Sequence, residues 1–97
     1  PAYREVYREL LIASRDMLME GLRRLQDKGL LTVQESCTNF AYIRVENARQ
    51  IFEALADRGI LVRLFGEDHL RITAGTQAEN QEVIACLDFL IQNREKL

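Results

Sequence analysis

Two short runs, one apolar except for Arg63 and one that alternates polar and apolar residues, constrain the fold of this 97-residue chain most strongly. They span 60–64 and 69–74, and Gly66 lies in the turn between them. An alternation with a period of two is typical of strands that bury one face, and a short glycine-containing turn joins antiparallel neighbours. The two runs therefore predict a hairpin with one apolar face and a second face that carries Arg63 and Arg71.

The segments before this hairpin predict a long helix followed by two strands. Apolar residues spaced three and four apart indicate an amphipathic helix over 3–28, which Gly29 ends. The run 31–34 is a candidate edge strand. The run 39–45 is a stronger strand, because its residues alternate between the two faces and include two aromatic side chains.

Two shorter helices complete the predicted chain. One begins at Asn47, where Gln50 would complete a capping box. The other begins at Thr76, where Glu79 would play the same part, and it runs to about residue 94. The predicted order is α-β-β-α-β-β-α. We expect one α+β domain over 1–97, a two-layer sandwich in which helices cover one face of a small, mainly antiparallel sheet.

The composition argues against several classes of protein. Hydrophobic residues make up 47% of the chain and charged residues 29%, which argues against a disordered segment. The net charge of -2 argues against a general nucleic-acid-binding protein, which needs a basic surface. No apolar run reaches the roughly 20 residues that cross a bilayer. Cys37 and Cys86 lie far apart with no histidine near either, so no metal site is expected, and we interpret them as reduced thiols of a cytoplasmic protein.

The uncovered face of the predicted sheet is the candidate site. The alternation places Arg63 and Arg71 on adjacent strands of this face. The other residues expected on it are Phe40, Tyr42, Arg44, Leu61 and Thr73. A guanidinium group offers a planar fork of donors that matches a carboxylate or a phosphate. The pattern is compatible with an anion-binding surface, and solvated arginines are the simpler interpretation of these residues taken alone.

Several ordered segments resemble the last third of histidinol-phosphate aminotransferases. They are Asn39-Phe40 with the alternating run after it, Gly59-Ile60-Leu61-Val62-Arg63, and Leu70-Arg71-Ile72-Thr73-Ala74-Gly75-Thr76 followed by Glu79-Asn80. Together they cover nearly the whole chain. The resemblance implies the carboxy-terminal small domain of an enzyme whose large domain binds pyridoxal 5'-phosphate. Such an enzyme transfers an amino group between histidinol phosphate and 2-oxoglutarate or glutamate in histidine biosynthesis.

The same resemblance assigns roles to two residues. Arg71 matches the family's substrate-carboxylate arginine, and Arg63 matches a second arginine that helps to hold the substrate phosphate. An arginine fork can bind the carboxylate of glutamate and the phosphate of an amino-alcohol phosphate alike. Leu64 stands where many relatives carry aspartate, and aromatic aminotransferases and phosphothreonine decarboxylases share much of the pattern. The amine substrate therefore stays open.

The resemblance also implies partners outside this chain. The parent enzyme would be a cytoplasmic homodimer, and its large domain would supply the lysine that bonds covalently to the cofactor. The lysines here are Lys28, at a helix end, and Lys96, near the end of the sequence, and neither is expected in a pocket. We therefore expect the chain alone to bind no cofactor and to be inactive in transamination.

Two other functions compete with this interpretation. One is a stand-alone regulatory module that binds a small anion, such as an amino acid, on the uncovered sheet face. The other is an RNA-binding sheet that stacks bases on Phe40 and Tyr42, which the acidic charge balance disfavours. The single histidine, His69, is interpreted as a solvated turn residue, because no nucleophile or orienting group is expected beside it.

Overall fold

The structure, a computed structural model, describes residues 2–36 and 39–93. Side chains are described from Ala13 onward, with those of residues 35 and 36 left aside. The elements in chain order are α1 (Ala2–Asp27), β1 (Thr32–Ser36), β2 (Phe40–Arg44), α2 (Ala48–Asp57), β3 (Arg63–Phe65), β4 (His69–Thr73) and α3 (Gln77–Gln92). The predicted order and the α+β class are confirmed. Cys37, Lys96 and the predicted helix end near residue 94 lie outside the described residues.

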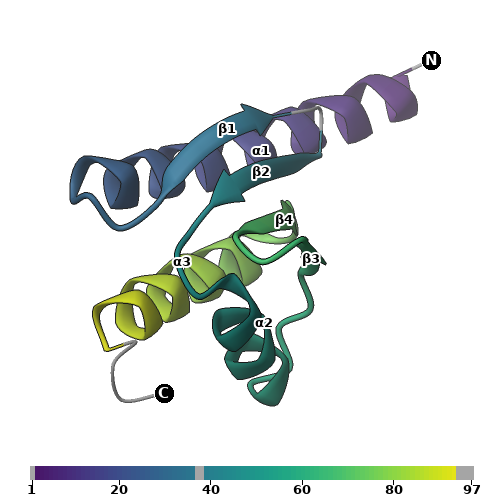
Figure 1. The fold of residues 1–97 in the computed structure, drawn as a ribbon. Coiled ribbons are helices and arrows are strands. Elements are labelled where there is room, and N and C mark those ends of the chain that lie inside the picture. The colour runs from purple at the N-terminus through teal and green to yellow at the C-terminus, as the bar shows by residue number, and fades with distance from the viewer. Residues whose placement is uncertain (1, 37–38, 94–97) are drawn as a thin grey trace.

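The four strands form one antiparallel sheet with the order β1-β2-β4-β3 (Figure 1). Hairpins join β1 to β2 and β3 to β4, and the pairing of β2 with β4 brings the two hairpins together. In that central pair Tyr42 lies opposite Arg71, and Ile43 lies opposite Leu70. Because successive side chains alternate between faces, this register gives the sheet one apolar face and one face that carries aromatic and charged groups.

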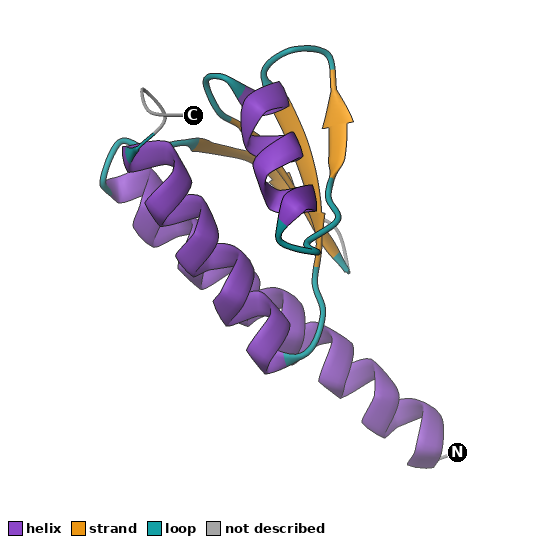
Figure 2. Ribbon diagram, turned by 90° about the horizontal axis from the view of Figure 1, so that it is seen from below, coloured by secondary structure: helices purple, strands orange, loops and turns teal. Residues whose placement is uncertain are grey.

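The three helices cover the apolar face of the sheet (Figure 2). Helix α1 packs against β1 and β2, helix α2 packs against β3 and β4, and α3 contacts both of these helices. The largest fully buried side chains between the layers include Leu18, Leu22, Ile43, Ile51, Leu55, Leu70, Ile72, Leu87 and Leu90. Over the described residues, none of the helices combines the length and the apolarity that a membrane span requires.

The helix ends confirm two of the three predicted signals. Gly29 follows α1 with a φ of 77°, a left-handed conformation that glycine adopts without strain. At the start of α3 the backbone N–H of Glu79 donates to the Thr76 hydroxyl (3.2 Å), and the Thr76 N–H donates to the Glu79 carboxylate (2.9 Å). The capping box predicted for Asn47 and Gln50 is wrong. Asn47 has a φ of 57° and makes no side-chain cap, because a capping side chain normally requires an extended backbone.

The strand predicted over 60–64 is wrong at its beginning, because β3 spans only Arg63–Phe65. The Ile60 N–H donates to the carbonyl of Leu55 in the last turn of α2 (2.9 Å). This bond holds Ile60 at the helix end, so the chain first pairs with β4 at Arg63, opposite Arg71. Apart from the predicted helix end near residue 94, the other strand and helix bounds agree with the sequence prediction within two residues.

A buried polar contact ties α1 to the turn that follows β4. Asn80 is 2% exposed, and its amide nitrogen lies 3.0 Å from both the carbonyl and the hydroxyl oxygen of Ser14. The Asn80 carbonyl oxygen accepts a hydrogen bond from the Gly75 N–H (2.8 Å), and the Ser14 hydroxyl donates to the Gly75 carbonyl. These bonds fix the end of β4, and therefore the strand that carries Arg71, relative to the two long helices.

Candidate anion-binding face

Eight side chains of β2, β3 and β4 lie on the uncovered side of the sheet, and these eight are called the open face below. They are Phe40, Tyr42 and Arg44 from β2, Arg63 and Phe65 from β3, and His69, Arg71 and Thr73 from β4. All eight are exposed or half-buried, whereas the residues between them on β2 and β4 are buried. The predicted face is confirmed for its strand residues. Leu61 lies before β3 with 82% of its surface exposed, so it is not part of the paired sheet.

Arg63 and Arg71 lie directly opposite each other on the paired strands β3 and β4. Among the side chains that the structure describes, no carboxylate lies within ion-pair distance of either one, whereas Arg44 pairs with Asp68 at 3.2 Å. Like charges opposite each other on neighbouring strands repel. An anion bound between the two guanidinium groups would offset this repulsion and would accept several of their hydrogen bonds.

Aromatic rings surround these arginines. The guanidinium carbon of Arg71 lies 5.1 Å from the ring centre of Phe40 and 5.8 Å from that of Phe65. The guanidinium carbon of Arg63 lies 5.6 Å from the same Phe65 ring. Tyr42 meets Phe65 edge to face, with 5.6 Å between ring centres. The face therefore combines two arginines, which have no carboxylate partner among the described side chains, with rings that attract cations through their negative faces.

The interpretation of His69 as a solvated turn residue is wrong. His69 begins β4, and its ring stacks on Tyr42 with 5.1 Å between ring centres and an angle of 11° between planes. Its Nε2 lies 2.9 Å from the amide oxygen of Gln34, and its Nδ1 lies 2.8 Å from a carboxylate oxygen of Asp68. Contacts on both ring nitrogens hold the imidazole in place on the open face.

Phe65 is the functional candidate that the sequence analysis missed. It lies just after the predicted strand 60–64, and because it follows Arg63 by two residues, alternation places it on the same face. The same spacing links His69 to Arg71. Extending the period of two across both ends of the turn would have placed both rings on the open face.

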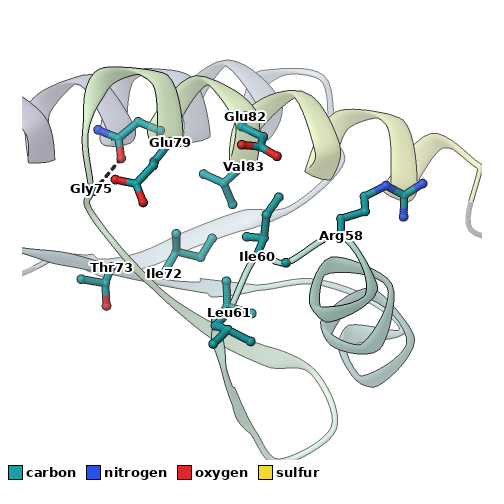
Figure 3. A pocket seen from close by; sticks show the side chains of 12 residues that line it. Arg58, Ile60, Leu61, Ile72, Thr73, Gly75, Glu79, Glu82 and Val83 are labelled. Atoms are coloured by element: carbon teal, nitrogen blue, oxygen red, sulfur yellow. Dashed lines mark hydrogen bonds between the residues drawn. The ribbon is translucent and has the colours of Figure 1, made fainter.

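A hollow of about 290 Å³ lies beside this face, between residues 59–62 and the beginning of α3 (Figure 3). Thr73 and Gly75 line its opposite side, and Glu79 and Glu82 contribute carboxylates. Because β3 begins only at Arg63, three residues later than predicted, this part of β4 has no strand neighbour on that side. Neither Arg63 nor Arg71 lines it, so it is separate from the pair of arginines.

The cofactor that the resemblance implies requires a lysine in a suitable pocket, and Lys28 is the described candidate. Contrary to expectation, Lys28 borders a groove of about 330 Å³ between α1 and α3. Its ammonium group pairs there with Asp88 at 3.2 Å, and no aromatic residue lines the groove. These residues do not fit a pyridoxal-phosphate site. Across the described chain, no cluster of three or more histidine, cysteine or acidic side chains is arranged to hold a metal ion.

The fold and the open face define an α+β domain with paired arginines on an uncovered sheet. No protein-family model matches the chain. The chain is 34% identical to histidinol-phosphate aminotransferase 2 of Bacillus cereus, over 84% of this chain and 25% of the relative. Histidinol-phosphate aminotransferases of Ruminiclostridium cellulolyticum and a Hydrogenobaculum species are 31% and 36% identical, over 89% and 87% of the chain and 25% of each relative.

The resemblance to the histidinol-phosphate aminotransferase family is thereby confirmed. The chain spans about a quarter of the length of the curated relatives that it matches.

Proposed function

We propose that this chain is the small, substrate-binding domain of a pyridoxal-phosphate-dependent aminotransferase of the histidinol-phosphate type. In this proposal the open face forms one wall of the active site, and a large domain outside the chain forms the other. The observation that carries the proposal is the pair Arg63 and Arg71, which lie opposite each other with no described carboxylate partner. Two such guanidinium groups on rigid strands favour an anionic ligand over a neutral one.

The proposed roles follow from the chemistry of the two substrates. Glutamate and 2-oxoglutarate carry carboxylates, whereas histidinol phosphate carries a phosphate and no α-carboxylate. Arg71, half-buried in the central part of the face, binds the anionic group of either substrate in this proposal. Arg63, which is more exposed, adds contacts to the phosphate. Binding the anion at a distance from the amine would orient the amine toward the reacting group of the cofactor.

The large domain is a necessary partner in this proposal. It would hold the cofactor, whose ring stabilises the carbanion formed when the substrate loses a proton, and it would supply the covalently bonding lysine. The 97-residue chain alone would therefore be inactive. The cytoplasmic location and the homodimeric parent remain predictions from the resemblance. A stand-alone module that binds an amino acid on the same face is the rival function, and it predicts that the isolated chain is a self-contained homodimer that binds an amino acid without any large domain.

The test compares Arg71→Ala and Arg63→Ala in an enzyme that carries this segment together with its large domain. Arg71→Ala is expected to lower kcat/KM for both glutamate and the phosphate-bearing amine, because each substrate loses a charge-assisted contact. Such a loss costs about 2–4 kcal/mol, or about thirty- to a thousandfold in kcat/KM. Arg63→Ala is expected to impair the phosphate substrate more than glutamate. Arg71→Lys should restore only part of the activity, because it keeps the charge and loses the planar fork.

Arg58→Ala is the matched control. Arg58 also contacts an aromatic ring, with its guanidinium carbon 6.0 Å from the ring centre of Phe89, but it ends α2 and lies on none of the strands that carry the open face. Its replacement should leave kcat/KM for both substrates within about twofold, as expected of a surface change remote from the site. Near-normal efficiency of Arg71→Ala with both substrates would end the assignment of the open face as an active-site wall.

A further inference from the structure

One aromatic ring contacts both arginines of the open face. The ring centre of Phe65 lies 5.6 Å from the guanidinium carbon of Arg63 and 5.8 Å from that of Arg71. Phe40 contacts Arg71 alone, at 5.1 Å. Among the described residues, Phe65 is thus the ring shared by the two cations that lie opposite each other on β3 and β4.

This shared contact counters an electrostatic problem. Two guanidinium groups that face each other on adjacent strands repel, and long side chains respond by turning apart into solvent. The negative face of an aromatic ring attracts a cation within about 6 Å. A ring that attracts Arg63 and Arg71 together therefore opposes their separation before any ligand binds, which reduces the ordering cost of binding.

Phe65 is itself held in place. Its ring is half-buried and meets Tyr42 edge to face, at an angle of 67°. Tyr42 stacks in turn on His69, whose ring nitrogens contact Gln34 and Asp68. The position of Phe65 is therefore supported by contacts that involve all four strands of the sheet and Asp68 of the turn that follows it.

We infer that Phe65 is a positioning residue that holds Arg63 and Arg71 together as one site for a single doubly charged anionic group, such as a phosphate monoester. This inference rests on the proposed function of the open face and adds a residue and a charge preference to it. Two guanidinium forks held side by side supply more donors than one carboxylate accepts, whereas a phosphate dianion accepts from both. Disorder of either arginine should therefore weaken phosphate binding more than carboxylate binding.

The experiment titrates the 97-residue chain with inorganic phosphate and, separately, with acetate. The side-chain Nε–Hε signals of the arginines are followed by NMR. Phe65→Leu removes the ring and keeps an apolar side chain, and it should weaken phosphate binding about three- to tenfold, because two cation–ring contacts are lost. Acetate binding should change less. Phe65→Tyr restores the ring and should bind phosphate within about twofold of the original chain.

Two further variants locate the effect. Phe40→Leu removes a ring that contacts Arg71 only, so it should shift the Arg71 signal, leave the Arg63 signal in place and weaken phosphate binding about twofold to threefold. Phe89→Leu is the matched control. Phe89 is an exposed ring on α3 that contacts Arg58, so its loss should change neither arginine signal of the open face nor phosphate affinity.

The outcomes separate this inference from the proposed function. If Arg71→Ala weakens phosphate binding and Phe65→Leu leaves it unchanged, the positioning role of Phe65 is wrong, but the open face still binds anions. If Arg71→Ala leaves phosphate binding unchanged, the open face is not the anion-binding site, and the positioning role of Phe65 is wrong as well. Should Phe65→Leu fail to fold by circular dichroism, nuclear Overhauser contacts in the unaltered chain decide. Contacts from the Phe65 ring to the side chains of both arginines support the inference, and their absence at either arginine overturns it.

Discussion

The strand β4 places two very different environments on its two faces. Leu70 and Ile72 are 0% and 1% exposed beneath the helices, whereas His69 and Arg71 lie half-buried on the open face. On the helix-covered side, each apolar side chain gains by leaving water, and the core excludes charged groups. On the open face, two like charges stand opposite each other, an arrangement that costs stability.

This difference agrees with the proposal that the covered side makes the fold and the open face serves binding. Residues that stabilise a domain are expected to agree with one another locally, and conflicts gather where function requires them. The covered side shows no such conflict, because its buried polar side chain, Asn80, has hydrogen-bond partners on both its amide atoms. Arg63 and Arg71 are the conflict on the open face, which supports a role in binding for both.

The largest expected effect comes from changing neighbouring residues on opposite faces of β4. Leu70→Ala should lower the free energy of unfolding by about 2–5 kcal/mol, because it leaves a cavity in the core. Arg71→Ala should change it by about 0.5 kcal/mol or less, because lost ring contacts are offset by relief of the repulsion from Arg63. Urea unfolding of both variants measures the difference. Equal losses would mean that the open face contributes to the fold as much as the core does.

The sequence predicted the covered side more completely than the open face. Burial imposes a period of two on β2 and β4, so the placement of residues such as Ile43 and Leu70 followed directly from their spacing. The beginning of β3 was predicted less well. The Ile60 N–H donates to the Leu55 carbonyl, a bond that commonly follows a helix-ending glycine such as Gly59, and the apolar run over 60–64 masked this signal.

The open face was predicted in part for a related reason. Arg63 and Arg71 lie inside the runs predicted as strands, whereas Phe65 and His69 border the turn, where polar and glycine residues masked the alternation. The contacts of His69 with Gln34 come from a strand 35 positions earlier, and a local reading cannot supply them. The roles of Arg63 and Arg71 came from the family resemblance and still await the tests described above.

A second variant examines the polar contact on the covered side. Asn80→Ala should destabilise the domain by about 1–3 kcal/mol, because the Gly75 N–H and the Ser14 carbonyl lose a partner in a buried place. The neighbouring Gln81→Ala is the control, since Gln81 is exposed on the same helix. Thermal unfolding of the two variants provides the measurement. If Asn80→Ala lowers stability no more than Gln81→Ala does, water replaces the Asn80 amide as the hydrogen-bond partner. The end of β4 would then be more accessible to water than the burial of Asn80 indicates.

The smallest expected effect concerns the response of the covered side to acid. The Thr76 N–H, and after it the Thr76 hydroxyl, hold the pKa of the Glu79 carboxyl below its ordinary value. Because this pKa is lower in the folded chain than in the unfolded chain, ionised Glu79 stabilises the fold above its ordinary pKa. That contribution is lost as the pH falls through the lowered value.

Glu79→Gln should therefore be slightly less stable than the unaltered chain at neutral pH, and the difference should shrink as the pH falls below about 4. The amide oxygen of glutamine can still accept the Thr76 N–H, so the comparison isolates the charge at the beginning of α3. Denaturant unfolding at a series of pH values measures the difference, with Glu82→Gln, an exposed residue one turn further along α3, as the control. A difference that stayed constant with pH, or that Glu82→Gln reproduced, would show that the carboxylate at the cap adds no stability through its charge. The acid response would then have to arise at another carboxyl group. Asp88 on α3 is the next candidate, because the Gln92 amide and, after it, Lys28 lower its pKa.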